Sequence, residues 1–493
     1  MRGFARSSRR LASAGVSSLR NPLACFGLAL GAFVAALAGW APSTWAGWSA
    51  PHVVASAAPL RLGGGPVSAI EGRVAVDSRG DVAVAWSRTG ARPGEYRGRR
   101  CSWGPGEPPP RRLGCYPLTT VHLTVVMARG QTVTRVVSTA RAERLIGVVL
   151  SPAEATVLLG YTTPRVSSQG GLRVAYGPPI GNWSAQQTIS GRWSIGWTNG
   201  LPLAQPHLAL ATDGTVLVAW NGCLTQHACD GVPGEGYAQQ RVVVAWHRPG
   251  RPFGPPTVVR AAPLGSVPQF DAAGRAYLSG SCSGTVASAP PHSRRFSPTI
   301  VTRGAARSFT LTLSAAGQGL AAWIAGPCAY GELTPPQPGP VFVSLLRGSE
   351  LLPPLALSTA PAESAYAAAT PAGATVCWEA RAANGVEEPF SAQVSAGGLP
   401  GTTQQGAEAI IPVTADGRGD LLLRGGRAAN TYGPGAPAPG PLADKLFVRP
   451  AGGGPDQPAP TPYGDAAAAP SGRTIALIWS PALTKLDVSI WRP

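Results

Sequence analysis

Seven cysteines lie downstream of residue 46, and they are the side chains with the clearest capacity for covalent chemistry. They have neither a Cys-x-x-Cys pair nor clustered histidines beside them, which disfavours a metal site. In an exported chain such cysteines form disulfides, and we predict that Cys101 pairs with Cys115 and Cys223 with Cys229, each pair closing its own loop. A bridge from Cys282 to Cys328 is a further possibility, whereas Cys377 sits inside a predicted strand as a buried free thiol.

Acid–base chemistry has few candidate residues in this sequence. Only 24 acidic residues are present, and Asp77, Asp213 and Asp416 occupy predicted turns. The six histidines are scattered, and no nucleotide-binding fingerprint occurs. We therefore predict no catalytic constellation, no metal site and no cofactor. A pair of carboxylates brought together from separate strands stays open, because such a pair has no spacing signature in a sequence.

Tryptophans recur at one fixed place in the repeat described below, the end of its second strand. This fixed place predicts core packing for Trp86, Trp220, Trp323, Trp378 and Trp479. Trp193 and Trp197 fall outside that pattern, so they could stack on a ligand or pack within a loop. With His227 and Tyr330, which lie on long predicted loops, they make up the candidate ligand-binding set.

The elements that position these residues follow from a repeat of strand, tight turn and strand. Alternating small and apolar residues flank a turn rich in Asp and Gly, which is typical of a β-hairpin. The clearest copies are 73–86, 207–220, 309–323, 365–378 and 465–479, with looser copies at 145–161, 269–280 and 410–424. The turns recur every 56 residues on average, which fits a four-stranded propeller blade.

The remaining strands of each repeat predict how the ring closes. A third strand such as 242–249 and a fourth strand such as 253–259 follow each hairpin. The last repeat stops after its third strand at 488–493, while residues 48–51 resemble the start of a fourth strand. We predict an all-β, eight-bladed β-propeller whose last blade is completed by the N-terminal strand, or a seven-bladed one if the unit near Gln269 is not a full blade.

This repeat resembles the repeats of secreted bacterial β-propellers, similar to TolB-like and Asp-box propellers, over about residues 48–493. The Asp-box pattern is only approximated, for example at Asp77–Trp86. The resemblance implies the fold and raises a sialidase-like or other carbohydrate-active hydrolase or lyase at the central channel as an alternative function. The Phe/Tyr-Arg-Ile-Pro segment typical of sialidases is missing.

Composition and the N-terminus place the chain outside the cytoplasm. The 493 residues include 63 Gly and 51 Pro with only 13% charged residues, which favours a turn-rich β protein. Residues 1–46 combine five arginines, an apolar run and small residues near Ala46, as in an export signal or an uncleaved membrane anchor. Residues 47–493 then form the propeller domain, secreted or extracytoplasmic.

Charge and loop placement lead to the functional prediction. The net charge of +17 falls to +12 without residues 1–46, which could attract an anionic envelope polymer. No basic run with interleaved aromatics indicates nucleic acid. The long predicted insertions lie on one face, so we expect a monomeric, non-enzymatic module that binds a protein or a glycan there, with membrane contact only through an uncleaved N-terminal segment.

Overall fold

In the computed structural model, the regular elements of the described residues downstream of residue 46 are all β-strands. No helix in the described part of the chain is long and apolar enough to cross a membrane. The predicted signal or anchor at 1–46 lies outside the described residues. The structure describes residues 47–493 except 57–59, 63–64, 68–69, 91–117, 164–165, 199–200, 203–205, 225–239, 303–305, 315–317, 328–337, 348–349, 382–386, 399, 402, 406–408, 427–444, 462–463 and 483.

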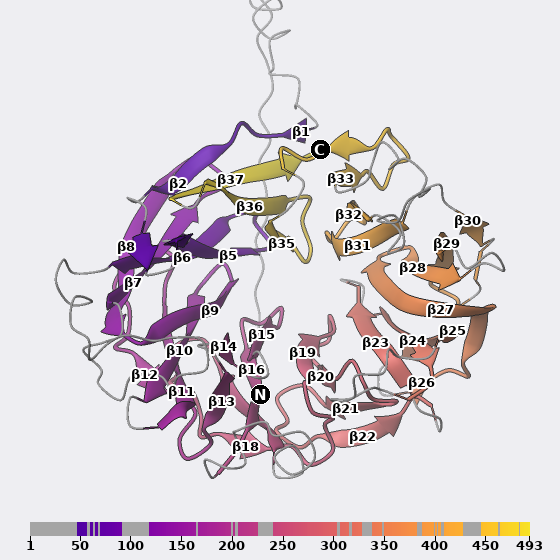
Figure 1. Cartoon of the computed structure of the whole chain (residues 1–493), viewed down its shortest axis with the longest axis horizontal. Coiled ribbons are helices and arrows are strands. Elements are labelled where there is room, and N and C mark those ends of the chain that lie inside the picture. Colours follow the sequence, from indigo (N-terminus) through magenta and orange to yellow (C-terminus); the bar gives the residue numbers. More distant parts are fainter. Residues whose placement is uncertain are drawn as a thin grey trace, which may run out of the picture. The chain divides into compact units, whose positions relative to one another are not determined.

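Each of the eight segments singled out as a hairpin forms an antiparallel strand pair, and the first strand of each pair lies toward the centre of the ring in Figure 1. Short alternating segments with a central Gly or Asp fold this way because the turn is local. The pairs are β5 (Ile70–Val76) and β6 (Val82–Gly90), β9 (Glu143–Leu150) and β10 (Ala155–Thr163), β15 (His207–Leu210) and β16 (Val216–Gly222), β19 (Val267–Phe270) and β20 (Ala276–Ser279), β23 (Ala306–Leu313) and β24 (Gln318–Ala325), β27 (Leu355–Thr370) and β28 (Gly373–Arg381), β31 (Ala409–Ala415) and β32 (Leu421–Gly426), and β35 (Asp465–Ala468) and β36 (Ile475–Ala482).

A third strand and a short outer strand extend most hairpins outward into antiparallel sheets. These strands are β7 (Leu118–Val126) and β8 (Thr132–Arg141), β11 (Val166–Gly177) and β12 (Gln187–Thr188), β17 (Arg241–His247) and β18 (Thr257–Val258), β21 (Thr285–Ala289) and β22 (Ser297–Ile300), β25 (Gly339–Arg347) and β26 (Glu350–Leu351), β29 (Glu387–Ser395) and β30 (Gln404–Gln405), and β33 (Leu446–Arg449) and β34 (Gln457–Pro458). The fourth strand expected at 253–259 shortens to β18, because Pro255 and Pro256 have no N–H to donate to a ladder.

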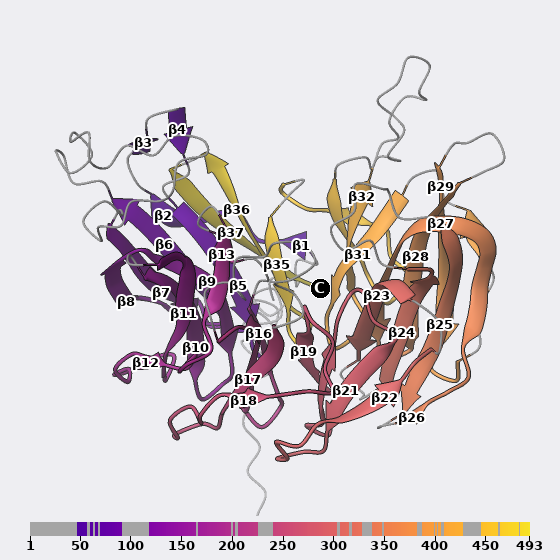
Figure 2. The same cartoon turned by 60° about the horizontal axis from the view of Figure 1, so that its bottom comes forward.

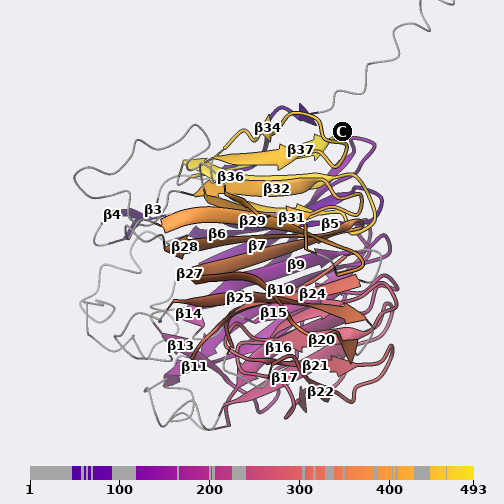
Figure 3. The ribbon, with the colours of Figure 1, turned by 90° about the vertical axis from the view of Figure 1, so that its right-hand side faces the viewer.

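One region departs from the pattern of one sheet per repeat. Strand β27 is 16 residues long and pairs with both β25 and β28, which joins β23–β30 into one eight-stranded sheet. The segment near Gln269 is a complete four-stranded sheet, β19–β22. The short strands β3 (Leu60–Leu62), β4 (Gly65–Val67), β13 (Ile195–Thr198) and β14 (Leu201–Pro202) lie at the end of the sheets away from the hairpin turns, as Figures 2 and 3 show.

Strands from both ends of the described chain share one sheet. Strands β1 (Gly47–Trp48) and β2 (His52–Ser56) pair antiparallel with β37 (Lys485–Arg492), with Trp48 opposite Trp491 and His52 opposite Val488. The Ser489 hydroxyl donates to the Ser49 carbonyl at 2.6 Å, and the Ile490 N–H donates to the Ser49 hydroxyl at 3.0 Å. The outer positions of the sheet that carries β35–β37 are therefore occupied by residues 47–56.

The hydrophobic core is divided into clusters, seven formed by side chains of two neighbouring sheets and one formed within the eight-stranded sheet, between β24–β25 and β27–β29. Trp220, Trp323 and Trp378 are each 2% exposed and belong to these clusters. The tryptophans at the ends of the second strands are therefore core residues, as the sequence predicts. Burying such large apolar side chains between sheets is the main favourable contribution to the fold.

Polar side chains on the innermost strands tie each sheet to the next. The Arg73 Nε donates to the Ile146 carbonyl at 3.1 Å, and the Gln269 amide donates to the Leu311 carbonyl at 2.6 Å. The Thr312 hydroxyl accepts from the Ala369 N–H at 2.9 Å, and the Asp465 carboxylate accepts from the Val74 N–H at 3.3 Å. These contacts satisfy backbone groups on inner edges that have no strand partner.

Candidate functional site

A cavity of about 380 Å³ lies where the turns of the inner hairpins converge. Every one of the eight hairpins contributes to its wall, including Ser78 from β5–β6, Thr212 from β15–β16 and Ala272 from β19–β20. Its volume falls within the usual range of small-ligand sites. The cavity lies at the end of the sheets where the inner strands, such as β5, run into their hairpin turns. The connections between sheets enter at the other end of these strands, on the same side as the long predicted loops. The cavity and the long predicted loops are therefore at opposite ends.

The local structure of the turns explains why the wall is well defined. In five of the eight turns, an Asp or Ser side chain at the start of the turn accepts hydrogen bonds from backbone N–H groups further on, as in an Asx-turn. The Asp271 Oδ1 accepts from the N–H groups of Ala273 and Arg275 at 3.0 and 2.9 Å, while its Oδ2 accepts from the Tyr277 hydroxyl at 2.9 Å. The Ser151 hydroxyl accepts from the Glu154 N–H at 2.9 Å. The predicted turn role of the aspartates is therefore confirmed for Asp77, Asp213 and Asp416.

Residues just after the start of several turns line the cavity. Ser78, Thr212, Ala272 and Ser471 are exposed and line the cavity, and Pro152 occupies the same position in the β9–β10 turn. Apolar side chains such as Leu210 and Phe270 also line the cavity. The cavity thus offers both hydroxyl groups and apolar surface, a combination suited to a polyhydroxylated ligand.

The two carboxyl groups of the wall differ in their electrostatics. The Asp271 carboxylate has hydrogen bonds on both oxygens. Burial and the neighbouring Asp420 carboxylate raise the pKa of Asp416 to about 6. The Oδ2 atoms of Asp416 and Asp420 are buried and have no hydrogen-bond partner. A proton on Asp416 would relieve its repulsion with the neighbouring Asp420 carboxylate.

Trp193, from the candidate ligand-binding set of the sequence, does not line this cavity. Trp193 is 8% exposed and packs in the cluster between the sheets of β9–β14 and β15–β18, with the Arg192 guanidinium 5.7 Å from its ring centre. This burial favours loop packing over ligand stacking. Trp197 lies in β13, next to the segment that contains Trp193. His227 and Tyr330 fall outside the described residues, so their ligand role stays a prediction.

The cysteine predictions are only partly within the described residues. Cys377 is buried and free, as expected, and burial raises the pKa of its thiol to about 12. Each predicted bridge includes at least one cysteine outside the described residues, namely Cys101, Cys115, Cys229 and Cys328. The three pairings therefore stay predictions. In the described part of the chain, no three metal-ligating side chains gather into a cluster.

The cavity residues were not among the candidates from the sequence. Their signal is a place in the repeat, just after the start of the hairpin turn, where several repeats have a short polar residue. Sequence reasoning assigned these turns a structural role and placed function on the long loops. It therefore missed that eight turns, separated along the chain, meet at one place.

Comparison with known proteins shows no family model and no curated protein that matches this chain. Among solved structures, an α-L-arabinanase from Penicillium chrysogenum complexed with arabinobiose is 12% identical with a TM-score of 0.38, covering 90% of this chain and 98% of the arabinanase. Hadza microbial sialidase Hz136 is 10% identical with a TM-score of 0.33, covering 76% of this chain and 73% of the sialidase. YCF48 bound to D1 peptide is 10% identical with a TM-score of 0.37, covering 71% of this chain and 94% of YCF48. These neighbours are β-propeller proteins, and at such TM-scores we take no activity from them.

Proposed function

We propose that residues 47–493 form an eight-bladed β-propeller that acts outside the cytoplasm as a non-enzymatic binding module for a glycan. Eight inner hairpins and eight core clusters support this blade count, with β23–β30 counted as two blades joined by β27. The pairing of β1 and β2 with β37 supports a ring closed by both ends of the domain. Residues 1–46 supply the export signal or anchor.

The observation that carries the glycan proposal is the lining of the axial cavity. Hydroxyl groups of Ser78, Thr212 and Ser471 can exchange hydrogen bonds with sugar hydroxyls, while the Phe270 ring and neighbouring aliphatic side chains can contact the apolar face of a sugar ring. A rigid ring of strands holds these turns in place before a ligand arrives, which reduces the entropy lost on binding.

Matched tryptophan substitutions in one turn test this proposal. Ala272 lines the cavity, whereas the adjacent Ala273 is equally exposed but does not line it. On an array of neutral and acidic glycans, we expect Ala272→Trp to abolish binding by filling the cavity and Ala273→Trp to leave it unchanged. A glycan that binds both variants and the wild type alike would place its site elsewhere and overturn the proposal. Binding of a protein through the long-loop face would also appear as insensitivity to both substitutions.

A second candidate, a carbohydrate-active hydrolase, is favoured by one observation. Asp416 lines the cavity, and burial beside Asp420 raises its pKa to about 6, which is a range suited to a general acid. Its Oδ1 already accepts from the Arg418 and Asp420 N–H groups, and a glycosidase needs a second, separately placed carboxylate. Release of reducing ends from a bound glycan by the wild type but not by Asp416→Asn would establish the hydrolase and displace the binding module.

A further inference from the structure

Exposed arginines gather at the end of the ring that carries the axial cavity. Three lie in the inner hairpin turns: Arg79, Arg418 and Arg473. Five lie in the turns between third and fourth strands: Arg129, Arg248, Arg251, Arg294 and Arg295. We call these eight residues the arginine collar. None of them forms an ion pair with any residue that the structure describes, unlike Arg449, which pairs with Asp456 at 2.9 Å.

The acidic residues of the same end do not balance the collar. Asp77, Asp271, Asp416 and Asp420 are buried and accept hydrogen bonds from backbone N–H groups of the turns. Among the described turns, only two acidic side chains are exposed, Asp213 and Glu350. Asp213 lies 3.8 Å from His292, and Glu350 is opposite Arg347 in the β25–β26 ladder. The exposed charge of this end is therefore strongly positive.

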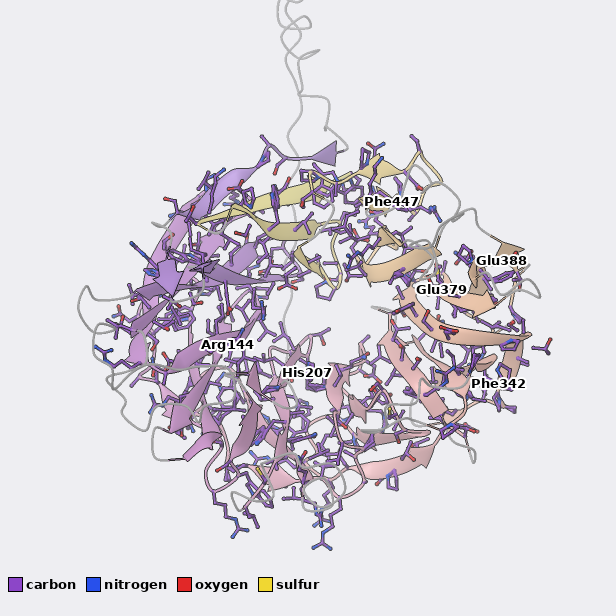
Figure 4. The ribbon with its side chains drawn as sticks, in the orientation of Figure 1. Arg144, His207, Phe342, Glu379, Glu388 and Phe447 are labelled. Carbon is purple, nitrogen blue, oxygen red and sulfur yellow. The ribbon has the colours of Figure 1, made fainter. Side chains whose placement is uncertain are left out.

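The inner members of the collar stand next to the cavity wall. Arg79 directly follows Ser78, Arg418 lies two residues after Asp416, and Arg473 lies two residues after Ser471. A ligand whose end occupies the cavity must pass these side chains. In Figure 4, the labelled His207 marks the inner layer of the ring, and Phe342 and Glu388 mark its periphery.

We propose that the arginine collar binds an acidic polysaccharide that bears carboxylate groups, with one chain end in the axial cavity. This inference rests on the proposed glycan-binding function and names its ligand class. A guanidinium presents paired donors that match a carboxylate, and a ring of such groups can contact successive sugar residues leaving the cavity.

The test compares two triple variants with the same change in charge. The collar variant carries Arg79→Ser, Arg418→Ser and Arg473→Ser. The control variant carries Arg88→Ser, Arg241→Ser and Arg260→Ser, which are exposed arginines near the other end of strands β6, β17 and β18. Binding to oligogalacturonate of defined length is measured by calorimetry at low and moderate salt, with neutral dextran oligosaccharide as the uncharged probe.

We expect the wild type and the control variant to bind oligogalacturonate alike, the collar variant to bind about tenfold more weakly, and dextran to bind weakly to all three. Added salt should weaken wild-type binding more than binding by the collar variant. Equal binding of dextran and oligogalacturonate by every variant would overturn the collar and leave the cavity proposal standing. Collar-dependent binding that Ala272→Trp does not affect would instead overturn the cavity. Tighter binding to single-stranded DNA or to phosphatidylglycerol vesicles than to oligogalacturonate would refute an acidic polysaccharide as the ligand.

Discussion

The turns of β5–β6 and β31–β32 have almost the same sequence and the same hydrogen bonds, yet their carboxyl groups differ. In both turns the first aspartate accepts from the second and fourth following N–H groups, at 2.8 and 2.9 Å for Asp77 and at 2.9 and 3.0 Å for Asp416. The second aspartate of each turn accepts from an outer turn at 2.7 Å, from Ala128 for Asp81 and from Ala451 for Asp420.

The difference lies in the burial of the second aspartate. Asp420 is 3% exposed, whereas Asp81 is half-exposed, so only the β31–β32 turn holds two carboxyl groups away from water. Burial raises the pKa of Asp77 too, but the buried neighbour helps to carry that of Asp416 to about 6. A shared turn motif therefore fixes hydrogen-bond geometry without fixing protonation.

The largest expected effect is that Asp416→Asn removes part of the pH dependence of the free energy of unfolding. Because the folded-state pKa of Asp416 is above its unfolded value of 3.8, the folded protein holds the proton more tightly, and wild-type stability falls as the pH rises from about 4 to 6. An asparagine at position 416 keeps the Oδ1 acceptor without that penalty. The free energy of unfolding of Asp416→Asn minus that of the wild type should therefore be roughly 2–3 kcal/mol larger at pH 7 than at pH 4. Urea unfolding at a series of pH values measures this, and Asp77→Asn should show the same sign with a smaller size. Parallel pH profiles of wild type and Asp416→Asn would contradict the comparison.

The next largest effect is a difference in stability loss between alanine substitutions at the glycines of the two turns. Gly80 and Gly419 have φ angles of +81° and +94°, so an alanine at either site is strained by about 1–2 kcal/mol. A Cβ at Gly80 would also lie 2.8 Å from the Thr474 hydroxyl, whereas the nearest atom at Gly419 would be at 3.4 Å. Thermal unfolding should show the greater loss for Gly80→Ala. In a Thr474→Ala background the two losses should converge, and a persistent gap would place the cause elsewhere.

A smaller effect concerns the outer hydrogen bond of the β5–β6 turn. Asp81→Ala removes the acceptor of the Ala128 N–H, and because Asp81 is half-exposed, water can replace it. We expect a loss of about 0.5–1 kcal/mol in the free energy of unfolding, measured with urea. Asp81→Asn retains an acceptor oxygen and should behave like the wild type. An equal loss in both variants would point to charge rather than the hydrogen bond.

The smallest effect on stability is expected for the exposed arginine of each turn. Arg79→Ser and Arg418→Ser remove side chains that have no ion-pair partner among the described residues, so each should change the free energy of unfolding by less than about 0.5 kcal/mol. The unfolding midpoint in urea measures this. A large loss in either variant would show that the arginine stabilises its turn and would weaken the case for a ligand role.

The strand pairs could be predicted from the sequence because their causes are local. Alternation, a turn with Asp and Gly, and a tryptophan at a fixed place recur in segments such as 207–220, and each such segment is a hairpin. Strand β27 was harder, because its 16 residues serve two neighbouring ladders, and nothing local in 355–370 shows where one ladder ends.

The site was less accessible to sequence reasoning. Trp193 looks available because it lies outside the repeat, but it fills space between two sheets, a property of the packed structure. The cavity wall combines turns from Ser78 to Ser471, so no window of sequence contains it. The placement of the eight collar arginines at one end likewise depends on the direction in which each strand runs.

The pairing of residues 47–56 with β37 also sets an order in time. Strands β1 and β2 emerge from the ribosome before the other described strands, but their ladder partner among the described strands is β37, more than 400 residues later. At ordinary rates of synthesis this interval lasts roughly 20–90 s, during which both strands lack their ladder partner. The last sheet therefore cannot form on the same schedule as the hairpins, each of which can fold as soon as its own two strands have been made.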